Sequence, residues 1–394
     1  MPERASPNIG RRTAEVDVAI VGGGIAGLWL ANLLGRRGYG CVLLEADALG
    51  AAQTLASQGL IHGGLKYALA GSLTGASEAI AGMPARWRAC LDGRGEVDLS
   101  AVRPLADRYC LFAAESTLGR LTAFFASRAL RGRIERLEPR DYPPALKDPG
   151  FRGVVYALDD FVLDARQLVT ALARGAAGRL YRHRLEPGAA AHAADGVLLD
   201  LGGERLLARR LVLAAGAGNE PLLAGLDLDV PMQRRPLQQV LVRHRYPHPL
   251  FGHCLTGIRR PEPRLTITSH RTGEDWLWYL GGQLATDGAA LAPEALVRHA
   301  RAELDACLPW IDWRDAAIST FTVDRAEPAQ RGGRRPDQAF VEARGNCLVC
   351  WPTKLSLVPD LGDRVLALLP PPSAAEPPPL ALPAPEVGPL PWER

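Results

Sequence analysis

Residues 16–47 read VDVAIVGGGIAGLWLANLLGRRGYGCVLLEAD, and this stretch decides the fold. Residues 16–21 form a short apolar run, rich in β-branched side chains and followed by glycines, which predicts a buried parallel strand. Apolar residues then recur at helical spacing over 25–37, where Gly38 ends the helix, and 41–45 predicts a second strand. Strand, glycine turn, helix and strand make one βαβ unit of the Rossmann type.

The glycines between the first strand and the helix indicate a dinucleotide site. Gly22 permits the tight turn, Gly24 lets the backbone approach a diphosphate, and Gly27 lets helix and strand pack closely. The helix opens at Ile25 and Ala26, and its N–H groups and positive potential suit a diphosphate. We expect dinucleotide binding because the glycines have this full context; a purely structural glycine turn is the alternative.

Glu45 ends the second strand about twenty residues after the glycines, which is the usual place for the acid of such a site. Its carboxylate can accept hydrogen bonds from both ribose hydroxyls, and Ala46 follows it. This arrangement suits an adenosine without a 2′-phosphate.

The composition is that of an ordinary globular protein. The 394 residues are 47% hydrophobic and 23% charged with a net charge of +3, so no electrostatic case exists for a nucleic-acid partner. No apolar run approaches the roughly 20 residues of a membrane helix. The N-terminus lacks the layout of a secretion signal. We expect residence in the cytoplasm, and contact with the inner face of the membrane as a peripheral protein stays open.

Cysteines and histidines indicate neither disulfides nor a metal. Seven cysteines are an odd number and are spread over the chain, which argues for a reducing compartment. Cys347 and Cys350 form a lone C-x-x-C in an apolar, strand-like setting, which favours a buried structural pair. Four histidines do not show the spacing of metal ligands, so no metal is predicted: His244, His248, His253 and His270.

The rest of the chain predicts further helices and strands. Helices are expected over 76–91, 118–130, 161–174, 293–308 and 361–369, and strands over 205–214, 317–324 and 347–351. Asp160 or Asp164 is the expected N-cap of the helix at 161–174. Residues 237–283 alternate between apolar and polar side chains, which predicts antiparallel sheet. The prolines after 370 predict a flexible or polyproline tail, with docking of a protein partner as a second interpretation.

The choice of dinucleotide depends on distant segments. A nicotinamide site is usually completed within the first half of such a fold, whereas a flavin ring must be walled along its length. Three segments suit that purpose: TLASQGLIHGGLKYALAG at 54–71, AAGAG at 214–218 and WPTKLSLVP at 351–359. This arrangement favours FAD. An NAD-dependent enzyme is the alternative, and the visible absorbance of bound flavin distinguishes the two.

Residues 18–47 together with SQGLIHGGLKYAL at 57–69 resemble the FAD-dependent oxidoreductases of the D-amino-acid oxidase superfamily. Within it they are most like the glycerol-3-phosphate dehydrogenase and L-2-hydroxyglutarate dehydrogenase branches. Other matching segments are DDFVLDARQLVTALA at 159–173, LVLAAGAG at 211–218, VPMQRRPLQQVL at 230–241, TVDRAEP at 322–328 and WPTKLSLVPDLGDRVLALL at 351–369. The closing motif of the family is usually glycine-rich, and Trp351 and Pro352 occupy that place here.

The resemblance implies how the flavin is held. Thr54, Ser57 and Gln58 would contact the ribityl or pyrophosphate region, and 59–63 would run past the isoalloxazine, where glycines keep the ring accessible. His62 would lie near the flavin edge as a proton acceptor or a covalent attachment point, or it props the loop. The expected FAD contacts are Gly22, Gly24, Ile25, Ala26, Gly27, Glu45, Ala46, Thr54, Ser57, Gln58, Gly59, Leu60, His62, Ala215, Gly216, Thr353, Lys354, Leu355 and Ser356.

Catalysis requires a base for the substrate proton and a positive group for the substrate's acid. His62 is the candidate base, and Arg325 is the candidate anion clamp, because guanidinium pairs bidentately with carboxylate or phosphate. A surface arginine paired with Glu327 is the alternative. Lys354 is expected to stabilise the anionic N1–C2=O edge of the reduced flavin. A lysine in solvent at a helix N-terminus is the alternative there.

We therefore predict an α/β protein: a Rossmann-type FAD-binding domain (14–230 and 325–369) with an inserted antiparallel-sheet substrate domain (231–324) and a tail (370–394). The expected function is oxidation of a small anionic 2-hydroxy acid or polyol phosphate by hydride transfer to flavin N5, with a quinone, carrier protein or oxygen as electron acceptor. A D-amino-acid or amine oxidase or dehydrogenase is the runner-up. A flavin-bearing assembly subunit, whose tail recruits a partner, is the alternative from another class.

Overall fold

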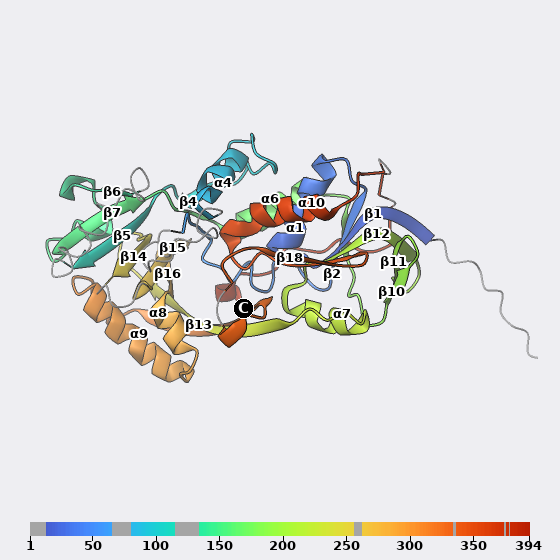
Figure 1. Ribbon diagram of the computed structural model, residues 1–394. Helices are drawn as coiled ribbons and strands as arrows, with labels where there is room; N and C mark the ends of the chain where they lie inside the picture. The colour runs from blue at the N-terminus through green and yellow to red at the C-terminus, as the bar shows by residue number, and fades with distance from the viewer. Residues whose placement is uncertain are drawn as a thin grey trace, which may run out of the picture.

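The computed structural model describes residues 13–64, 80–114, 134–255, 262–333, 336–373, 376–377 and 379–394. Two sheets divide the molecule into two halves, which lie side by side in Figure 1. The expected α/β fold, a Rossmann-type domain with a second sheet domain, is confirmed. The predicted helix at 118–130 lies outside the described residues.

The first sheet contains the βαβ unit. Its strands are β1 (Thr13–Val21), β2 (Cys41–Glu45), β9 (Leu180–Arg182), β10 (Ala190–Ala193), β11 (Gly196–Asp200), β12 (Arg205–Leu213), β18 (Phe340–Arg344) and β19 (Cys347–Trp351). β1 pairs in parallel with β2 on one side and with β12 on the other, and β12 pairs in parallel with β19. Segments far apart in the sequence therefore form the centre of one sheet.

Helices cover both faces of this sheet. α1 (Ile25–Arg36), α6 (Ala165–Gly175) and α10 (Val358–Leu368) pack on one face, and α7 (Asn219–Gly225) packs on the other (Figure 1). α1 is buried almost all round because α6 and α10 flank it. The predicted helix at 161–174 is divided in the structure: β8 (Phe161–Leu163) comes first, and the Asp164 carboxylate then caps α6 by accepting from Gln167 N at 2.9 Å.

The second sheet is larger than predicted. In order its strands are β17 (Ala317–Pro328), β13 (Met232–His244), β16 (Asp275–Gly281), β15 (Leu265–Thr272), β14 (Gly252–Leu255), β5 (Tyr109–Ala114), β7 (Gly153–Leu158) and β6 (Ile134–Arg136). The predicted boundaries of 231–324 are therefore too narrow. β5 to β7 come from earlier in the chain, and β14 pairs with β5 in parallel, so the sheet is mixed.

One face of the second sheet packs on helices α8 (Gln283–Gly288) and α9 (Pro293–Cys307), and α4 (Met83–Leu91) lies near the junction of the halves (Figure 1). A three-stranded sheet of β3 (Leu60–Ile61), β8 and β4 (Pro104–Ala106) holds the stretch that follows residue 59. The face of the second sheet away from α8 and α9 is thereby left for the functional site.

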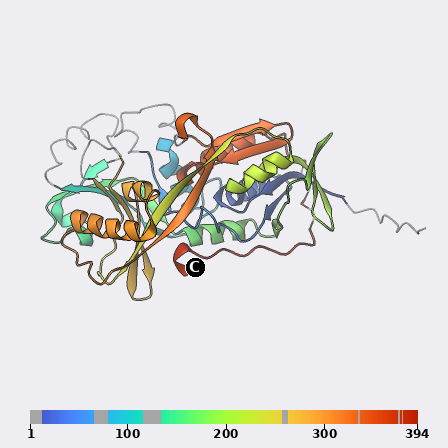
Figure 2. The same cartoon turned by 90° about the horizontal axis from the view of Figure 1, so that it is seen from below.

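The prediction of a flexible proline-rich tail is wrong for the described part of 370–394. Tyr39 Oη donates to Pro370 O at 3.0 Å, Arg182 N donates to Pro383 O at 2.7 Å, and Leu49 N donates to Glu386 O at 2.7 Å. Figure 2 shows this segment running along one side of the first half to the C-terminus. Proline removes N–H donors but leaves carbonyl acceptors, and those carbonyls hold the segment to its own chain.

The predicted buried character of Cys347 and Cys350 is confirmed: both thiols are free and buried. Burial raises the pKa of the Cys347 thiol to about 11 and that of Cys350 to about 12, so neither is a nucleophile near neutral pH. Within the described ranges no group of three or more His, Cys, Asp or Glu side chains has a metal-binding arrangement.

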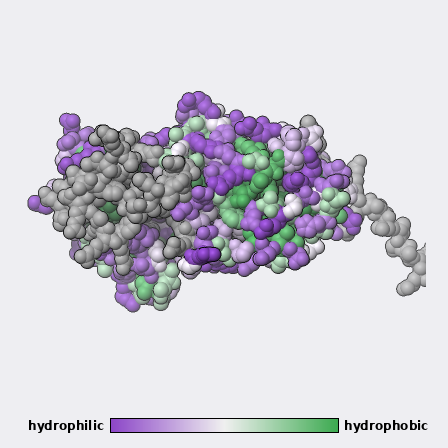
Figure 3. All heavy atoms as spheres, viewed as in Figure 1, coloured by the Kyte–Doolittle hydropathy of each residue, from purple (hydrophilic) through white to green (hydrophobic). Residues whose placement is uncertain are grey.

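Hydrophilic residues spread over most of the coloured surface in Figure 3, with an apolar area over the half that carries α1 and α10. None of the helices in the described ranges combines the length and the apolar character needed to cross a membrane.

Candidate active site

A cavity of about 1060 Å³ lies between the two halves and is lined by both. Its walls are the glycine turn after β1, the loop from Ala46 to His62, the end of β12, the segment from Cys350 to Leu355, and one face of the second sheet. This is large for a small-ligand site and suits an extended cofactor together with a substrate. Every predicted FAD contact lines it except Gly27 and Ser356.

The glycine turn has the geometry of a diphosphate cradle. Gly22 has a φ of +111°, and a Cβ there would lie 2.6 Å from Ala215 Cα. A Cβ on Gly27 would lie 1.9 Å from Gly22 O, so this glycine serves packing beneath the turn. A Cβ on Gly24 would meet only Thr54 Oγ1, at 3.4 Å, which leaves its other side open to a ligand. Gly22 and Gly27 therefore have the turn and packing roles that the motif predicts, and the diphosphate contact at Gly24 stays a prediction.

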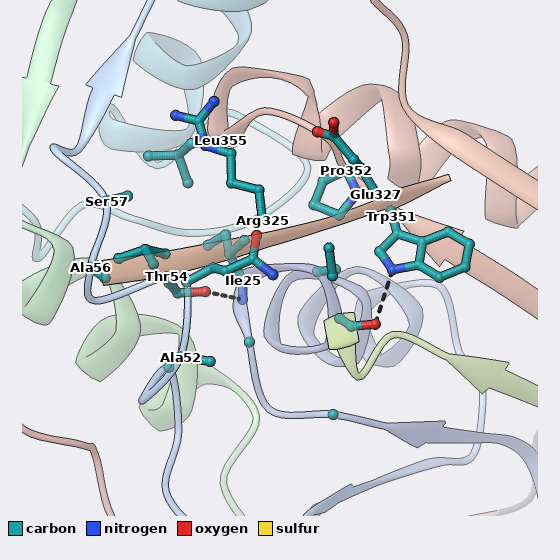
Figure 4. A pocket seen from close by; sticks show the side chains of 18 of the residues that line it. Ile25, Ala52, Thr54, Ala56, Ser57, Arg325, Glu327, Trp351, Pro352 and Leu355 are labelled. Atoms are coloured by element: carbon teal, nitrogen blue, oxygen red, sulfur yellow. Dashed lines mark hydrogen bonds between the residues drawn. The ribbon is translucent and has the colours of Figure 1, made fainter. Parts of the chain in front are cut away.

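The N-terminus of α1 faces the cavity. Gly24 caps the helix without a side-chain hydrogen bond, and the first turn contains no acidic residue that would compete with an anion. Ile25 N donates to Thr54 Oγ1 at 3.0 Å (Figure 4). Thr54 thus holds its loop against the helix as well as lining the cavity.

Glu45 links β2 to the glycine turn. Its Oε2 accepts from Gly23 N at 2.5 Å, and its Oε1 accepts from Asp47 N at 2.9 Å. Each carboxylate oxygen has a second lone pair for a ribose hydroxyl. Turn, helix N-terminus and carboxylate together fit the adenosine diphosphate part of FAD.

The stretch at 57–63 is fixed from several sides. Gly59 has a φ of +68°, and a Cβ there would lie 1.9 Å from Leu163 O, so only glycine fits. His62 N donates to Ser356 Oγ at 2.9 Å, and Gly63 N donates to Asp160 Oδ1 at 2.8 Å. The His62 side chain is buried and lines the cavity.

Gln58 reaches the second half of the molecule. Its Nε2 donates to Thr266 O at 3.1 Å and to Tyr279 O at 2.8 Å, which are carbonyls of β15 and β16. The resemblance gave this residue a contact with the ribityl or pyrophosphate region, and that contact stays a prediction. The structure also shows that these hydrogen bonds link the loop at 46–62 to the second sheet.

The closing segment adds a fixed cation. Trp351 Nε1 donates to Gly216 O at 3.0 Å, which joins β19 to the end of β12 (Figure 4). The Lys354 side chain is 1% exposed, and its Nζ donates to Asp337 O at 3.2 Å and lies 3.5 Å from Asp337 Oδ1. Lys354 is therefore a buried residue of the cavity wall and not a lysine in solvent. Its role toward the flavin stays a prediction.

Arg325 projects from β17 and lines the cavity, extending toward Leu355 in Figure 4. Glu327 is 1% exposed and accepts from Arg235 Nε at 2.9 Å and from Gln233 Nε2 at 2.9 Å. Arg235 lies directly opposite Arg325 in the β13–β17 pair and also lines the cavity. Two guanidinium groups and one carboxylate therefore make this wall net positive.

Sequence reasoning missed the polar residues on the second sheet. Arg235 and Gln239 of β13, His253 of β14 and Thr266 of β15 all line the cavity. His253 Nδ1 is 3.0 Å from Thr266 Oγ1. The alternation of β13 gives a signal, since residues 235, 237 and 239 share one face, but which face meets the cavity depends on the fold.

A diphosphate cradle on a Rossmann-type βαβ unit, with a cavity closed by a second sheet, defines a flavin-dependent oxidoreductase. The chain belongs to the DAO family of FAD-dependent oxidoreductases, whose family profile matches residues 17–348. It is therefore an enzyme, and FAD is its cofactor. The D-amino-acid oxidase superfamily resemblance is confirmed at this level.

A probable FAD-dependent oxidoreductase of Pseudomonas aeruginosa is 50% identical over 386 residues, covering 94% of this chain and 98% of that protein. The crystal structure of an FAD-dependent oxidoreductase from the same species has a TM-score of 0.82 at 43% identity and covers 97% of this chain and 98% of its own. The sequence and the fold are thus similar over nearly the whole chain.

More distant solved structures share the fold alone. L-α-glycerophosphate oxidase from Mycoplasma pneumoniae with FAD bound has a TM-score of 0.64 at 13% identity, covering 90% of this chain and 94% of its own. Glycine oxidase from Geobacillus kaustophilus has a TM-score of 0.62 at 20% identity, covering 91% and 95%.

Proposed function

We propose that the enzyme oxidises a small organic anion, a 2-hydroxy acid or a polyol phosphate, at the carbon that bears the hydroxyl group. The observation that carries this proposal is Arg325, which lines the cavity on the same wall as the ion-paired Arg235 and Glu327. A guanidinium in a partly buried cavity binds carboxylate or phosphate through charge-assisted hydrogen bonds. Within its superfamily we propose the hydroxy-acid and glycerol-phosphate side, with oxidation of an amino acid or amine as the alternative.

Oxidation of an alcohol requires removal of the hydroxyl proton as well as of the hydride. FAD, when bound in this cavity, would supply the acceptor for that hydride. His62 and His253 are buried imidazoles in the cavity wall, and each is the type of group that accepts such a proton. We assign the proton to His62, because it lies within residues 59–63, the stretch expected beside the flavin ring.

Lys354 supports an anionic ligand in the same cavity. Asp337 holds its ammonium group in the wall next to Leu355. A cation fixed in a buried place needs no reorganisation when negative charge develops nearby. The electron acceptor in this proposal is a quinone, a carrier protein or oxygen.

The test is reduction of the flavin without air. Purified holoenzyme is mixed with 2-hydroxyglutarate, glycerol 3-phosphate, lactate, D-amino acids and sarcosine, and loss of flavin absorbance is recorded. Bleaching by a hydroxy acid or polyol phosphate supports the proposal. Bleaching by amino acids alone establishes the amine-oxidising alternative instead.

Arg325→Met tests the anion clamp with whichever substrate bleaches the flavin. Loss of hydrogen bonds to a charged group is expected to raise KM about 10- to 100-fold. Arg234→Met is the matched control, because Arg234 lies on the neighbouring strand and pairs with Glu220 at the surface. Equal KM values for the Arg325 variant and the control would contradict the proposal.

A further inference from the structure

Four residues form a row across the second sheet on its cavity side. Thr266 of β15 pairs with Gly281 of β16 and with His253 of β14. Val240 of β13 pairs with Leu280, which places Gln239 opposite Gly281. The order across the sheet is therefore Gln239, Gly281, Thr266 and His253, and all four line the cavity. The second sheet forms one wall of the cavity, and this row runs across that wall.

Gly281 leaves a gap in this row, and Gln58 fills it. A Cβ on Gly281 would lie 2.5 Å from Gln58 Oε1 and 3.5 Å from Gln239 Oε1, so the two carboxamides meet above this glycine. Gln58 Nε2 uses its two hydrogens on the carbonyls of Thr266 and Tyr279. This fixes the orientation of the amide and leaves Oε1 as an acceptor.

Gln239 is a buried carboxamide without a hydrogen bond to any residue that the structure describes. Its side chain lines the cavity, the residue is 6% exposed, and its Oε1 is fully buried. A buried amide without a partner costs folding free energy, and buried polar groups are otherwise almost always paired. Because Oε1 is closed to the cavity, a ligand there would bond to the Nε2 group of the same amide, which no described residue pairs.

We propose that Gln239 and Gln58 form a polar subsite above Gly281 that binds a hydroxyl or amino group of the substrate. The fixed acceptor, Gln58 Oε1, selects a group that donates a hydrogen bond, and the Gln239 amide supplies a second contact. This rests on the proposed function, because the substrate's anionic group is held by Arg325.

The strand geometry separates the anion clamp, Arg325, from the polar subsite at Gln239. Arg325 lies opposite Arg235, and Gln239 is four residues further along β13, about 13 Å at the rise of a strand. The long arginine side chain shortens this span. The substrate class is therefore a 2-hydroxy acid or polyol phosphate that carries a further hydroxyl or amino group remote from the charge.

The experiment compares unreactive ligand pairs of equal size. ω-Hydroxycarboxylates of three to six carbons are titrated into the oxidised holoenzyme beside alkyl carboxylates in which a methyl group replaces the hydroxyl, and Kd is read from the flavin absorbance. For at least one chain length the hydroxy compound is expected to bind about tenfold more tightly, as one neutral hydrogen bond provides. Equal affinity at every length, or no binding at any length, would overturn the proposal.

Gln239→Met removes the amide at nearly constant size and is expected to abolish that preference while leaving the Kd of the alkyl carboxylate in place. Gln238→Met is the control, because Gln238 is the next residue on β13, is buried, and faces the opposite side of the sheet. The preference should survive in this control.

Two further readouts separate the alternatives. Without ligand, Gln239→Met is expected to raise the Tm of the holoenzyme, since an unpaired buried amide is removed; a lower Tm would show that the amide is structural. A shifted flavin spectrum in this variant with an unchanged hydroxyl preference would place the amide at the cofactor and overturn the proposal. If Arg325→Met leaves the affinity of both ligands unchanged, the anion clamp fails while the hydroxyl preference still tests Gln239.

Discussion

Thr353 has a φ of +60°, a backbone conformation that β-branched residues seldom adopt. It lies in the closing motif, which the family resemblance describes as usually glycine-rich. Its hydroxyl donates to Gln338 O at 2.9 Å in an exposed position. The strain is therefore held in the segment that carries Lys354 and lines the cavity, where strained backbone is often found in enzymes.

Thr353→Gly is expected to raise the free energy of unfolding of the holoenzyme by about 1 kcal/mol, because glycine adopts this conformation without a steric penalty. The exposed hydrogen bond that is lost contributes little. Urea unfolding measures the change. Thr322→Gly on the extended strand β17 is the control and is expected to lower the same free energy. Equal losses in the two variants would contradict the prediction.

Two buried histidines make stability depend on pH. Burial lowers the pKa of His244 to about 4 and that of His270 to about 4, from 6.5. His244 Nδ1 accepts from Tyr246 N at 3.2 Å, a bond that protonation of Nδ1 would break. Between pH 6.5 and 4 the unfolded chain therefore binds more protons than the folded one, and stability falls as the pH is lowered.

Each histidine is expected to contribute about 1.4 kcal/mol for each pH unit within that window. His244→Phe should reduce the slope of unfolding free energy against pH between 6.5 and 4 by this amount. Chemical denaturation at several pH values measures it, and His248→Phe at a half-buried position is the control. An unchanged slope for the His244 variant would show that its imidazole is charged in the folded state.

At the scale of elements, the β13–β17 pair joins the proposed anion-binding wall, which carries Arg325 and Arg235, to the rest of the second sheet. Glu327 is 1% exposed and pairs with Arg235, which is 26% exposed. Glu327→Gln removes the charge and is expected to lower the free energy of unfolding by about 3 kcal/mol, since breaking a buried ion pair leaves a charge uncompensated.

Arg234→Gln is the matched control for that variant. Arg234 is adjacent on β13, and its partner Glu220 is 58% exposed, so the expected loss is below about 1 kcal/mol. Thermal unfolding of both variants measures the difference. Similar losses would show that burial does not strengthen the Arg235–Glu327 pair.

The local pattern predicted elements better than it predicted their partners. The helix at 25–37 and the strand at 347–351 match α1 and β19 within one residue because periodicity and glycine stops are local signals. β5 joins the second sheet although it precedes 231 by more than a hundred residues, and no local signal encodes that pairing. Gln239 was missed for the same reason. Which face of β13 lines the cavity depends on the pairing of β13 with β16, and the sequence of β13 does not encode that pairing.

The proline-rich segment at 370–394 shows most clearly that local sequence does not predict tertiary contacts. Composition predicted disorder because prolines exclude helix and central strand. In the structure, the backbone N–H groups of this segment form hydrogen bonds with distant residues. Leu380 N donates to Tyr181 Oη at 3.3 Å, and Gly388 N donates to Leu49 O at 3.0 Å. Those partners are spread along the first half of the chain and are invisible in the segment itself.

At the scale of the whole molecule, the C-terminal segment at 384–394 connects the loop at 46–62, which lines the cavity, with the second sheet. Leu49 accepts from Gly388 N, and Ala51 O accepts from the Arg394 guanidinium, both in the loop that lines the cavity. Trp392 packs against His270 at 4.6 Å between ring centroids and against Tyr279 at 6.4 Å. The segment at 384–394 therefore supports, from outside, one wall of the cavity in which we expect FAD to bind.

Deletion of residues 384–394 is expected to raise the Kd for FAD about tenfold or more, because the loop at 46–54 loses the contacts that order it. Fluorescence titration of the apoprotein with FAD measures the change. Trp392→Ala should give a smaller effect in the same direction, and Arg314→Ala, whose partner Asp312 is local and exposed, should give none. An unchanged Kd after deletion would limit the segment to a role away from the cofactor.

The order of strands in the first sheet also dictates when the enzyme can mature during its synthesis. β1 is synthesised about two hundred residues before its neighbour β12, and β19 follows later still. Early translation products thus expose apolar strand edges and have no complete place for the coenzyme. Loading of FAD is consequently a late step, and chaperones that shield nascent β1 should improve the yield of yellow protein.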